Sequence, residues 1–243
     1  MQLYRDDGVV LRTQKLGEAD RIVTVLARKT GRVRAVAKGV RRTKSRFGAR
    51  LEPFTHVDLM LYPGRSLDVI TQAEVIRSYG APLTADYPRY TTGVAMLETA
   101  ERFAPEDKEP SLRQFLLLVG GLRALGETAH DPRLVLDAYL LRSLAVAGYA
   151  PALRECARCG ASGRLPAFAI PAGGMVCASC RPHGAAAPGL ATVNLMSALL
   201  RGDWDSADQS ERRHQVECSG LVAAYLQWHL EHSIRSLRHV ERV

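Results

Sequence analysis

Short runs of alternating apolar and polar residues fill the first third of the chain, a pattern typical of half-buried β-strands. The alternation is strictest over residues 32–38, where Val33, Ala35 and Ala37 lie on one face and the charged side chains on the other. Strands are predicted over residues 9–11, 21–28, 32–38, 57–62 and 67–76. Five strands in so short a segment predict a small closed antiparallel barrel, the OB fold.

Beyond residue 79 the apolar positions follow a helical period instead. The best delimited helix has Asp131 as its N-cap, Pro132 at its first position, and Gly148 and Pro151 after its end. Helices are predicted over residues 90–103, 112–126, 132–147, 193–200 and 211–240. The fold class is therefore expected to be α+β multidomain, with an OB-fold barrel domain over residues 1–79 and an all-α helical domain over residues 80–243.

Two Cys-x-x-Cys pairs interrupt the helical part of the chain. Cys156 and Cys159 form the first pair, Cys177 and Cys180 form the second, and 17 residues separate the pairs. This is the zinc-ribbon spacing, because each short turn presents two sulfurs on one side and two turns complete a tetrahedron. The four cysteines predict one structural zinc ion, held in a small lobe at about residues 154–188 that is inserted in the helical domain.

Other residues of the predicted lobe favour a fold that a metal holds together. Gly160 permits a tight turn after the second cysteine, and Phe168 and Ile170 are expected to form a minimal core. So small a lobe cannot fold on hydrophobic burial alone, and the metal would supply its stability. A pair of redox-active dithiols is the alternative, but thioredoxin-like chemistry needs a strand-to-helix context that this stretch lacks. The fifth cysteine, Cys218, is interpreted as a buried thiol.

The composition is that of a globular protein with a real core. Of the 243 residues, 47% are hydrophobic, yet no stretch approaches the ~18 apolar residues that would span a bilayer. Arg5, Asp6 and Asp7 stand where a signal peptide needs an apolar run. Five cysteines, an odd number, argue against a disulfide framework. We therefore expect a cytoplasmic protein with no membrane partner.

Positive charge is concentrated in residues 21–51, which we call the basic window. The window contains 11 Lys and Arg residues and no Asp or Glu, although the whole chain carries a formal charge of only +8. The rest of the chain is therefore net negative. A patch of one sign usually has a polyanionic partner, and the first candidate is nucleic acid. A loop kept soluble by its charge is the alternative, but a solvated surface normally mixes its signs.

Eight cations of the basic window are candidate contacts to DNA phosphates, and five of them fall within nine residues at the end of the strand 32–38. The candidates are Arg32, Arg34, Lys38, Arg41, Arg42, Lys44, Arg46 and Arg50. Aromatic residues are scarce in the barrel segment, so base stacking can contribute little. We therefore expect phosphate-directed binding that is indifferent to sequence, with a salt dependence that corresponds to about six neutralised phosphates.

The common motifs of catalysis are absent from the sequence. It has no phosphate-binding loop, no dinucleotide-binding glycine motif and no Gly-x-Ser-x-Gly, so no catalytic residue is predicted. His229 and His232 are interpreted as histidines on the surface of the last helix. Three alternatives stay open. One is an RNA- or ribosome-associated binding factor, since barrels and zinc ribbons serve both nucleic acids. Another is a nuclease, which would need a carboxylate cluster near the basic window. A third, plainer option is a pure interaction scaffold, which a DNA-shift experiment would test.

The barrel segment resembles the bacterial RecO recombination-mediator family. The matching stretches are Glu18-x-Asp20-Arg-Ile-Val-Thr-Val-Leu, Thr30-Gly31-Arg32, Val36-Ala-Lys38-Gly39-Val-Arg41-Arg42 with Ser45-Arg46, and Leu51-x-Pro53-Phe54. The order of the parts also agrees over the whole chain: a barrel, a helical domain and a four-cysteine zinc lobe. The helical region matches in character only, so partner surfaces cannot be transferred to it residue by residue.

The resemblance implies a role in DNA repair and homologous recombination. It implies binding to single- and double-stranded DNA and annealing of complementary strands. It also implies that the protein, together with RecR, helps to load RecA onto gaps coated by single-strand-binding protein, which places it at the nucleoid. Annealing needs no catalytic residue, because a basic surface that lowers phosphate repulsion can hold two strands without reading their bases.

Overall fold

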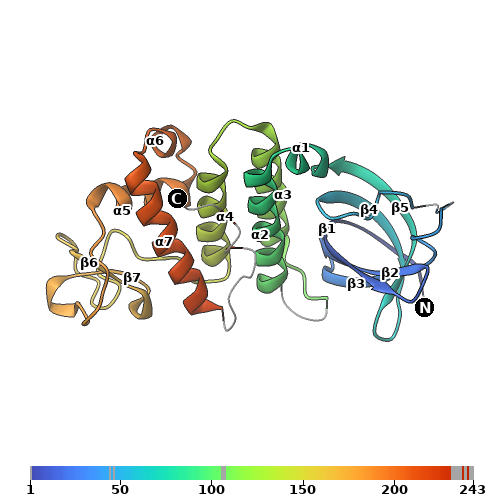
Figure 1. The fold of residues 1–243 in the computed structure, drawn as a ribbon. Helices are drawn as coiled ribbons and strands as arrows, with labels where there is room; N and C mark the ends of the chain where they lie inside the picture. Colours follow the sequence, from blue (N-terminus) through green and yellow to red (C-terminus); the bar gives the residue numbers. More distant parts are fainter. Residues whose placement is uncertain are drawn as a thin grey trace. The chain divides into compact units, whose positions relative to one another are not determined.

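The structure is a computed structural model that describes residues 2–43, 45, 47–104, 108–230, 237 and 240. The chain forms two compact units, Met1–Glu127 and Thr128–Val243 (Figure 1). The first unit contains a β-barrel and three helices. The second contains the remaining helices and the cysteine-bearing lobe.

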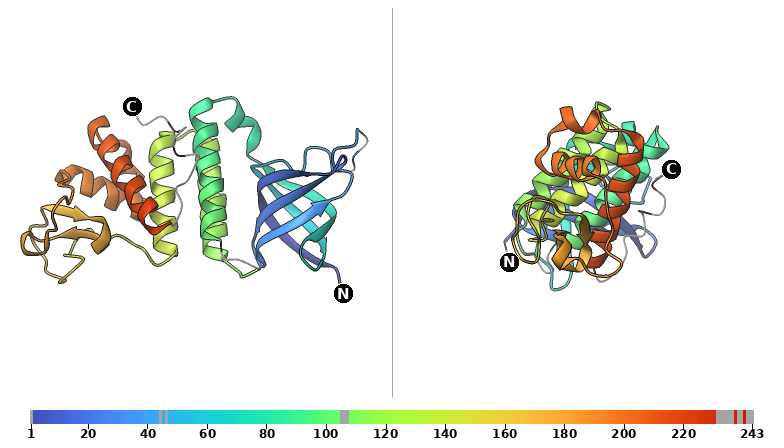
Figure 2. Two further views of the ribbon diagram at one scale, coloured as in Figure 1. Left: turned by 60° about the horizontal axis from the view of Figure 1, so that its bottom comes forward. Right: turned by 90° about the vertical axis from the view of Figure 1, so that its left-hand side faces the viewer.

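Five strands close the barrel of the first unit. In chain order they are β1 (Tyr4–Leu16), β2 (Asp20–Ala27), β3 (Gly31–Ala37), β4 (Thr55–Tyr62) and β5 (Asp68–Ser78). Around the barrel the order is β1-β2-β3-β5-β4, with β4 paired back to β1, and only the β3–β5 pair is parallel. The left view of Figure 2 shows the strands wrapping around the barrel from a further direction. This is the OB fold, so the predicted fold class is confirmed.

The directions of the strands place the loops at two ends of the barrel. β1, β3 and β5 run one way, and β2 and β4 run the other. The β1–β2 loop, the β3–β4 loop and the last residues of β5 therefore share one end, which we call the loop end. The β2–β3 turn and the β4–β5 loop share the opposite end.

The barrel is filled by the inward side chains of the alternating strands. Val33, Ala35 and Ala37 are at most 1% exposed, as the alternation predicts, and Leu59 and Ile70 pack in the same core. Each of these side chains contributes stability in proportion to its buried apolar area, roughly 25 cal/mol per Å². The strand pattern written in the sequence thus accounts for the barrel directly.

Three helices complete the first unit: α1 (Gly80–Thr84), α2 (Tyr87–Phe103) and α3 (Leu112–Glu127). α2 begins three residues before its prediction, because Asp86 accepts a hydrogen bond from the backbone of Arg89 and Pro88 occupies the first turn. α2 and α3 pack on each other and contact β1. An ion pair of 2.9 Å between Arg12 on β1 and Glu101 on α2 adds to this contact.

The second unit is built from helices that flank a small irregular lobe. The helices are α4 (Pro132–Val146), α5 (Leu190–Arg201), α6 (Trp204–Asp208) and α7 (Arg212–His229). The lobe contains β6 (Ala167–Ala169), η1 (Ile170–Ala172), β7 (Gly174–Val176) and η2 (Ala178–Cys180). α4, α5 and α7 pack together, and Asp131 caps α4 by accepting a hydrogen bond from the N–H of Arg133, as predicted. Within the described part of the chain, no helix is long and apolar enough to cross a membrane.

The last helix is shorter than the sequence pattern indicates. The prediction ran over residues 211–240, but α7 ends at His229. Leu230 leaves the helix with φ −104° and ψ 125°, and its N–H closes the last turn on the carbonyl of Leu226. No glycine or proline marks this end, so the sequence carries no stop signal. Most of the remaining predicted stretch lies outside the described residues.

The division into compact units falls at a different place from the predicted domain boundary. β5 ends at Ser78, one residue before that boundary, but the contacts group α1, α2 and α3 with the barrel rather than with the later helices. The domain assignment of residues 1–79 and 80–243, and the extent of the lobe at 154–188, stay predictions.

Candidate nucleic-acid interface and metal centre

β3 presents a row of cations on the outside of the barrel. Because alternate residues of a strand point to opposite faces, the inward Val33 and Ala35 turn Arg32 and Arg34 outward. Arg34 is exposed and Arg32 is half-buried. Lys38 continues the row just after the strand and is also exposed. From Arg32 to Lys38 the row extends over about 20 Å, at ~3.3 Å per residue.

The loop after β3 adds exposed cations at the loop end of the barrel. Arg41 and Arg42 follow Lys38 after Gly39 and Val40, Arg50 lies near the end of the same loop, and all three are exposed. Gly39 makes the turn possible: its φ of +68° is left-handed, and its N–H donates to the carboxylate of Asp20 at 2.7 Å. The Lys-Gly-x-Arg-Arg segment is therefore a turn that fans cations outward.

Arg41 holds the two loops of the loop end together. Its Nη1 donates to the carbonyl oxygen of Glu18 at 2.9 Å and to that of Gly17 at 3.3 Å, both in the β1–β2 loop. This arginine therefore fixes the loop while it adds charge to the surface. Among the described residues, Arg34, Lys38 and Arg42 make no ion pair, so no acidic side chain of this part of the chain neutralises their charges.

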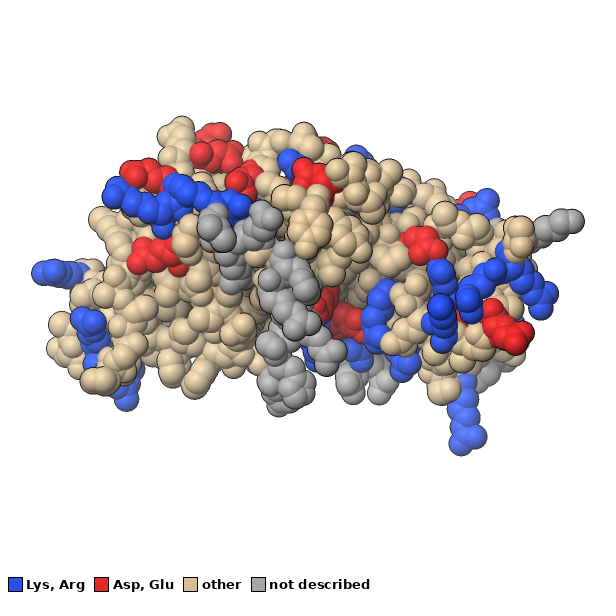
Figure 3. Space-filling model, in the orientation of Figure 1, with Lys and Arg blue, Asp and Glu red and all other residues tan. Residues whose placement is uncertain are grey.

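Six of the eight predicted DNA contacts thus lie along one side and one end of the barrel. We call this set the basic face: Arg32, Arg34, Lys38, Arg41, Arg42 and Arg50. The other two predicted contacts, Lys44 and Arg46, lie outside the described residues. In Figure 3, Lys and Arg side chains gather on the barrel with few acidic ones among them. The assignment of these residues to DNA stays a prediction.

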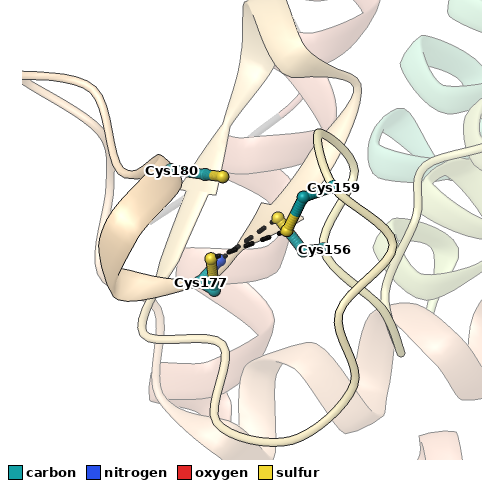
Figure 4. A group of neighbouring side chains, drawn as sticks. All are labelled: Cys156, Cys159, Cys177 and Cys180. Carbon is teal, nitrogen blue, oxygen red and sulfur yellow. Dashed lines mark hydrogen bonds between the residues drawn. The ribbon is translucent and has the colours of Figure 1, made fainter.

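The four predicted metal ligands come together in the second unit. The ligand atoms of Cys156, Cys159, Cys177 and Cys180 all lie within 4.8 Å of one another, and their sulfurs face a common centre (Figure 4). The sulfurs of Cys159 and Cys177 are 3.9 Å apart. A tetrahedral site with metal–sulfur bonds of ~2.3 Å has sulfur–sulfur edges of about 3.8 Å. The four cysteines therefore form a closed metal-binding site.

Backbone geometry positions the two pairs of sulfurs. Gly160 has a left-handed φ of +72° and donates its N–H to the carbonyl of Cys156 at 2.8 Å, which closes the first knuckle as predicted. In the second pair, Cys177 precedes the short helix η2 and Cys180 is its last residue, and the N–H of Cys180 donates to the carbonyl of Cys177. His183 is exposed and is not a member of the ligand cluster.

The electrostatics of the cluster favour a cation at its centre. The backbone N–H of Cys177 points at the sulfur of Cys156, 3.5 Å away, and lowers the pKa of that thiol to about 6. Hydrogen bonding with Cys177 and Cys159 raises the pKa of the Cys180 thiol to about 12. Four thiolates so close together would repel one another, and a bound divalent cation compensates their negative charge.

The interior of the lobe differs from the prediction in one respect. Ala167, Ala169, Val176 and Cys156 form its small buried cluster. Ile170, predicted as core, begins η1 and is only half-buried. Phe168 is buried, but its ring packs edge-on against Tyr225 of α7, with the ring centroids 5.7 Å apart. The large aromatic residue therefore anchors the lobe to the helices.

The thiol of Cys218 and the imidazole of His229 are both packed against other residues of the second unit. Cys218 is fully buried on α7, and burial raises the pKa of its thiol well above the ordinary value. His229, predicted to lie on the helix surface, instead stacks on Tyr149 at 4.4 Å between ring centroids. Its buried Nε2 atom has no hydrogen-bond partner among the described residues. His232 lies outside the described residues.

One feature of the barrel has no signal in the sequence. An open cavity of about 400 Å³ lies at the loop end, between the β3–β4 loop and the paired ends of β4 and β5. Thr55, Val75 and Ser78 line it together with the loop. These residues come from separate segments, and none belongs to a recognisable motif, so only the fold reveals them.

The barrel, the basic face and the closed cysteine site together define an OB-fold protein whose outer surface is suited to a polyanion. Comparison with known families agrees. Residues 1–79 match the family described as Recombination protein O N terminal, and residues 84–238 match Recombination protein O C terminal. The chain belongs to the RecO family of DNA repair proteins.

Full-length relatives support this assignment. The DNA repair protein RecO of Thermobifida fusca is 70% identical over 242 residues, with all of both chains covered. The proteins of the same name from Frankia casuarinae and Streptomyces griseus are 60% and 59% identical, again with full coverage of both chains.

Proposed function

We propose that the protein binds single- and double-stranded DNA through the basic face and anneals complementary strands. The observation that carries this proposal is the outward row of cations on β3, continued by the loop at the barrel end in a chain of the RecO family. The row of about 20 Å is about as long as the axial rise of six base pairs of duplex DNA, at ~3.4 Å each. Membership of the family favours DNA over RNA as the ligand.

The basic face acts by binding and not by catalysis. Flexible cations that neutralise phosphates without contacting base edges let two strands shift against each other until they pair. In the recombination pathway this activity is used together with RecR to load RecA at gaps covered by single-strand-binding protein. The protein then works at the nucleoid.

The metal of the second unit is a single structural zinc ion. Four sulfur ligands leave no open position for substrate, and a set of four cysteines is the donor set that structural zinc takes. Cys156, Cys159, Cys177 and Cys180 hold the ion, which stabilises the lobe and takes no part in DNA binding. Metal analysis of the purified protein should find one zinc per chain.

A charge-reversal experiment tests the DNA proposal. The double variant Lys38→Glu and Arg42→Glu should lose affinity for both DNA forms by on the order of 100-fold, because it removes two phosphate contacts and adds repulsion. Annealing of complementary strands should fall with it. The matched control reverses two exposed arginines outside the basic window, Arg102→Glu and Arg113→Glu, which make no ion pair within the described part of the chain.

The control variant should bind and anneal as the wild type does. Equal affinity of the Lys38 and Arg42 variant and the wild type would refute the assignment. Tighter binding to RNA in a competition assay would instead favour the RNA-binding alternative. Cleavage of the strands in the presence of magnesium would favour the nuclease alternative.

A further inference from the structure

The cavity at the loop end combines features of a ligand site. It measures about 400 Å³, within the range of small-molecule sites in proteins. The residues that give it chemistry are Ser45, Phe47, Arg50, Thr55, Val75 and Ser78. Four of these six residues therefore offer a hydroxyl or cationic group, and the other two are apolar.

The polar side of the cavity holds a hydroxyl that lacks a partner. Thr55 is only 3% exposed, and among the described residues its hydroxyl makes no hydrogen bond. Its backbone is occupied, because the N–H of Thr55 donates to the carbonyl of Glu52 at 3.3 Å. Ser45 accepts the backbone N–H of Phe47 at 3.2 Å, which leaves its own proton free to donate into the cavity.

Hydroxyl groups suit a ligand whose hydrogen-bonding groups differ from one case to the next, as those of the nucleobases do. Each can donate or accept, so the same groups can pair with the amino, imino or carbonyl groups of different bases. This fits a protein that binds DNA without sequence preference. A fixed amide or carboxylate at the same place would select one pattern.

The apolar side of the cavity provides surfaces for a flat ring. Phe47, 1% exposed, packs in the barrel core and is one of the residues that line the cavity. Val75 also lines the cavity, and its side chain is 45% exposed to solvent. Arg50 is exposed on the loop and belongs to the basic face. A base in the cavity would therefore have its phosphate beside a cation.

We propose that this cavity receives one unstacked nucleobase of single-stranded DNA, with Arg50 contacting its phosphate. The inference rests on the proposed DNA binding by the basic face and deepens it. The row on β3 contacts phosphates of either DNA form. The cavity serves single strands, because a base in a duplex would first have to leave its pair and its stack. The cavity thus gives the barrel a preference for single strands that charge alone does not provide.

Filling the cavity tests the proposal. Val75→Trp places a large ring in the cavity, whereas Ile76→Trp places the same ring on the next residue of β5, which is 52% exposed and does not line the cavity. The probes are a 20-nucleotide oligothymidylate, a strand of equal length with abasic sites, and a duplex of the same length. Val75→Trp should weaken binding of the oligothymidylate about fivefold or more, since one base contact contributes that much.

The other combinations should be unaffected by the filled cavity. Ile76→Trp should bind all three probes as the wild type does, and Val75→Trp should retain wild-type affinity for the duplex and for the abasic strand. Retained duplex affinity also shows that the variant is folded. Thr55→Val, which removes the hydroxyl but keeps the volume, should weaken oligothymidylate binding in the same direction by a smaller factor.

Three results would overturn the proposal. The first is an unchanged affinity of Val75→Trp for the oligothymidylate, and the second is an equal loss in both tryptophan variants. The third is an equal loss for oligothymidylate, abasic strand and duplex, which would make the cavity part of the phosphate surface. A wild-type protein that bound none of the probes would refute the proposed function itself, so the two failures are distinguishable.

Discussion

The barrel and the cysteine lobe are stabilised by opposite means. The barrel encloses a continuous apolar core that includes Val33, Leu59 and Ile70. The lobe encloses little beyond alanines, Val176 and its own cysteines. Hydrophobic burial scales with area, so the barrel has a large reserve of stability and the lobe has almost none. The closed sulfur cluster supplies what the core of the lobe cannot.

The same contrast applies to the distribution of function. The basic face is spread over six cations, so in the proposed function each would contribute a fraction of the binding, and the loss of one would be tolerated. The metal site is concentrated in four ligands, so each is essential to the lobe. Substitutions on a surface that binds polyanions should therefore lower its affinity step by step, whereas the loss of one ligand should abolish metal binding at a closed site.

The largest expected effect is the loss of one metal ligand. Cys177→Ser should abolish stoichiometric zinc binding and unfold the lobe, because the binding free energy of such a site, about 10–16 kcal/mol, is also its folding free energy. Hydrogen exchange over residues 154–188 should become fast. The affinity of the barrel for duplex DNA should stay within about twofold of wild type, since the basic face is built from the first unit alone.

Ser179→Ala is the matched control for this variant. Ser179 is exposed and lies in η2 between the two cysteines of the second pair. The control should retain one zinc per chain and slow exchange. A Cys177→Ser protein that kept both its metal and its exchange protection would contradict the account of the lobe.

A core substitution in the barrel should give the next largest effect. Leu59 is 1% exposed in the apolar core, so Leu59→Ala should lower the free energy of unfolding of the first unit by about 2–5 kcal/mol. Denaturant titration measures this change. The zinc content should not move. If zinc were lost together with the stability of the barrel, the two regions would not be independently stabilised.

The two regions also differ in how far the sequence predicts them. The cysteine site can be predicted from short stretches of sequence, because each Cys-x-x-Cys turn determines its own geometry. The same holds for β3, whose alternation of apolar and polar residues is visible in the sequence. The conformation of the loop end depends instead on contacts between residues that are distant in the sequence. Phe54 adopts a left-handed φ of +68°, unusual for a bulky residue, because its N–H bonds to Val10 and its carbonyl to Tyr79. Only the closed barrel brings those partners together.

Helix ends follow the same division. Asp131 caps α4 by a hydrogen bond within its own turn, so the start of this helix is readable from the sequence. The end of α7 at His229 has no local signal, and the short helix α6 depends on packing, since Trp204 stacks on His130 with ring centroids 4.1 Å apart. The cavity at the loop end also depends on distant contacts, because its lining comes from separate segments of the barrel. Elements fixed by distant contacts have to be observed.

A smaller effect is expected when one cation is removed from the basic face. Arg34→Ala should reduce the slope of log K against log salt by about 0.9 for duplex DNA and by about 0.7 for single strands, because one phosphate contact is lost. If about six phosphates are neutralised, the wild-type slope should be roughly −5 for duplex DNA and roughly −4 for single strands. Binding measured over a series of salt concentrations gives both values.

Arg113→Ala on α3 is the control for this measurement, since it removes one exposed cation outside the basic window. Its slope should equal that of the wild type. If both variants changed the slope equally, the DNA contact would extend well beyond the basic face, and the contrast between a localised barrel surface and the rest of the first unit would fail.

The smallest effect concerns the second unit at mildly acidic pH. Burial lowers the pKa of His229 below its ordinary value of 6.5, so the folded state favours the neutral ring, which stacks on Tyr149 and meets Tyr225 edge-on. The associated stability is fully present above about pH 6.5 and is lost as the pH falls through the folded pKa. Between pH 7 and 5 the free energy of unfolding should therefore fall more steeply in the wild type than in His229→Phe, which keeps an aromatic ring but cannot be protonated. Protonation of the cysteine ligands acts equally in both proteins, so the difference between the two curves isolates the histidine. Curves that run parallel would mean that the charged ring is accommodated at no cost, and that groups other than His229 set the acid sensitivity of the second unit.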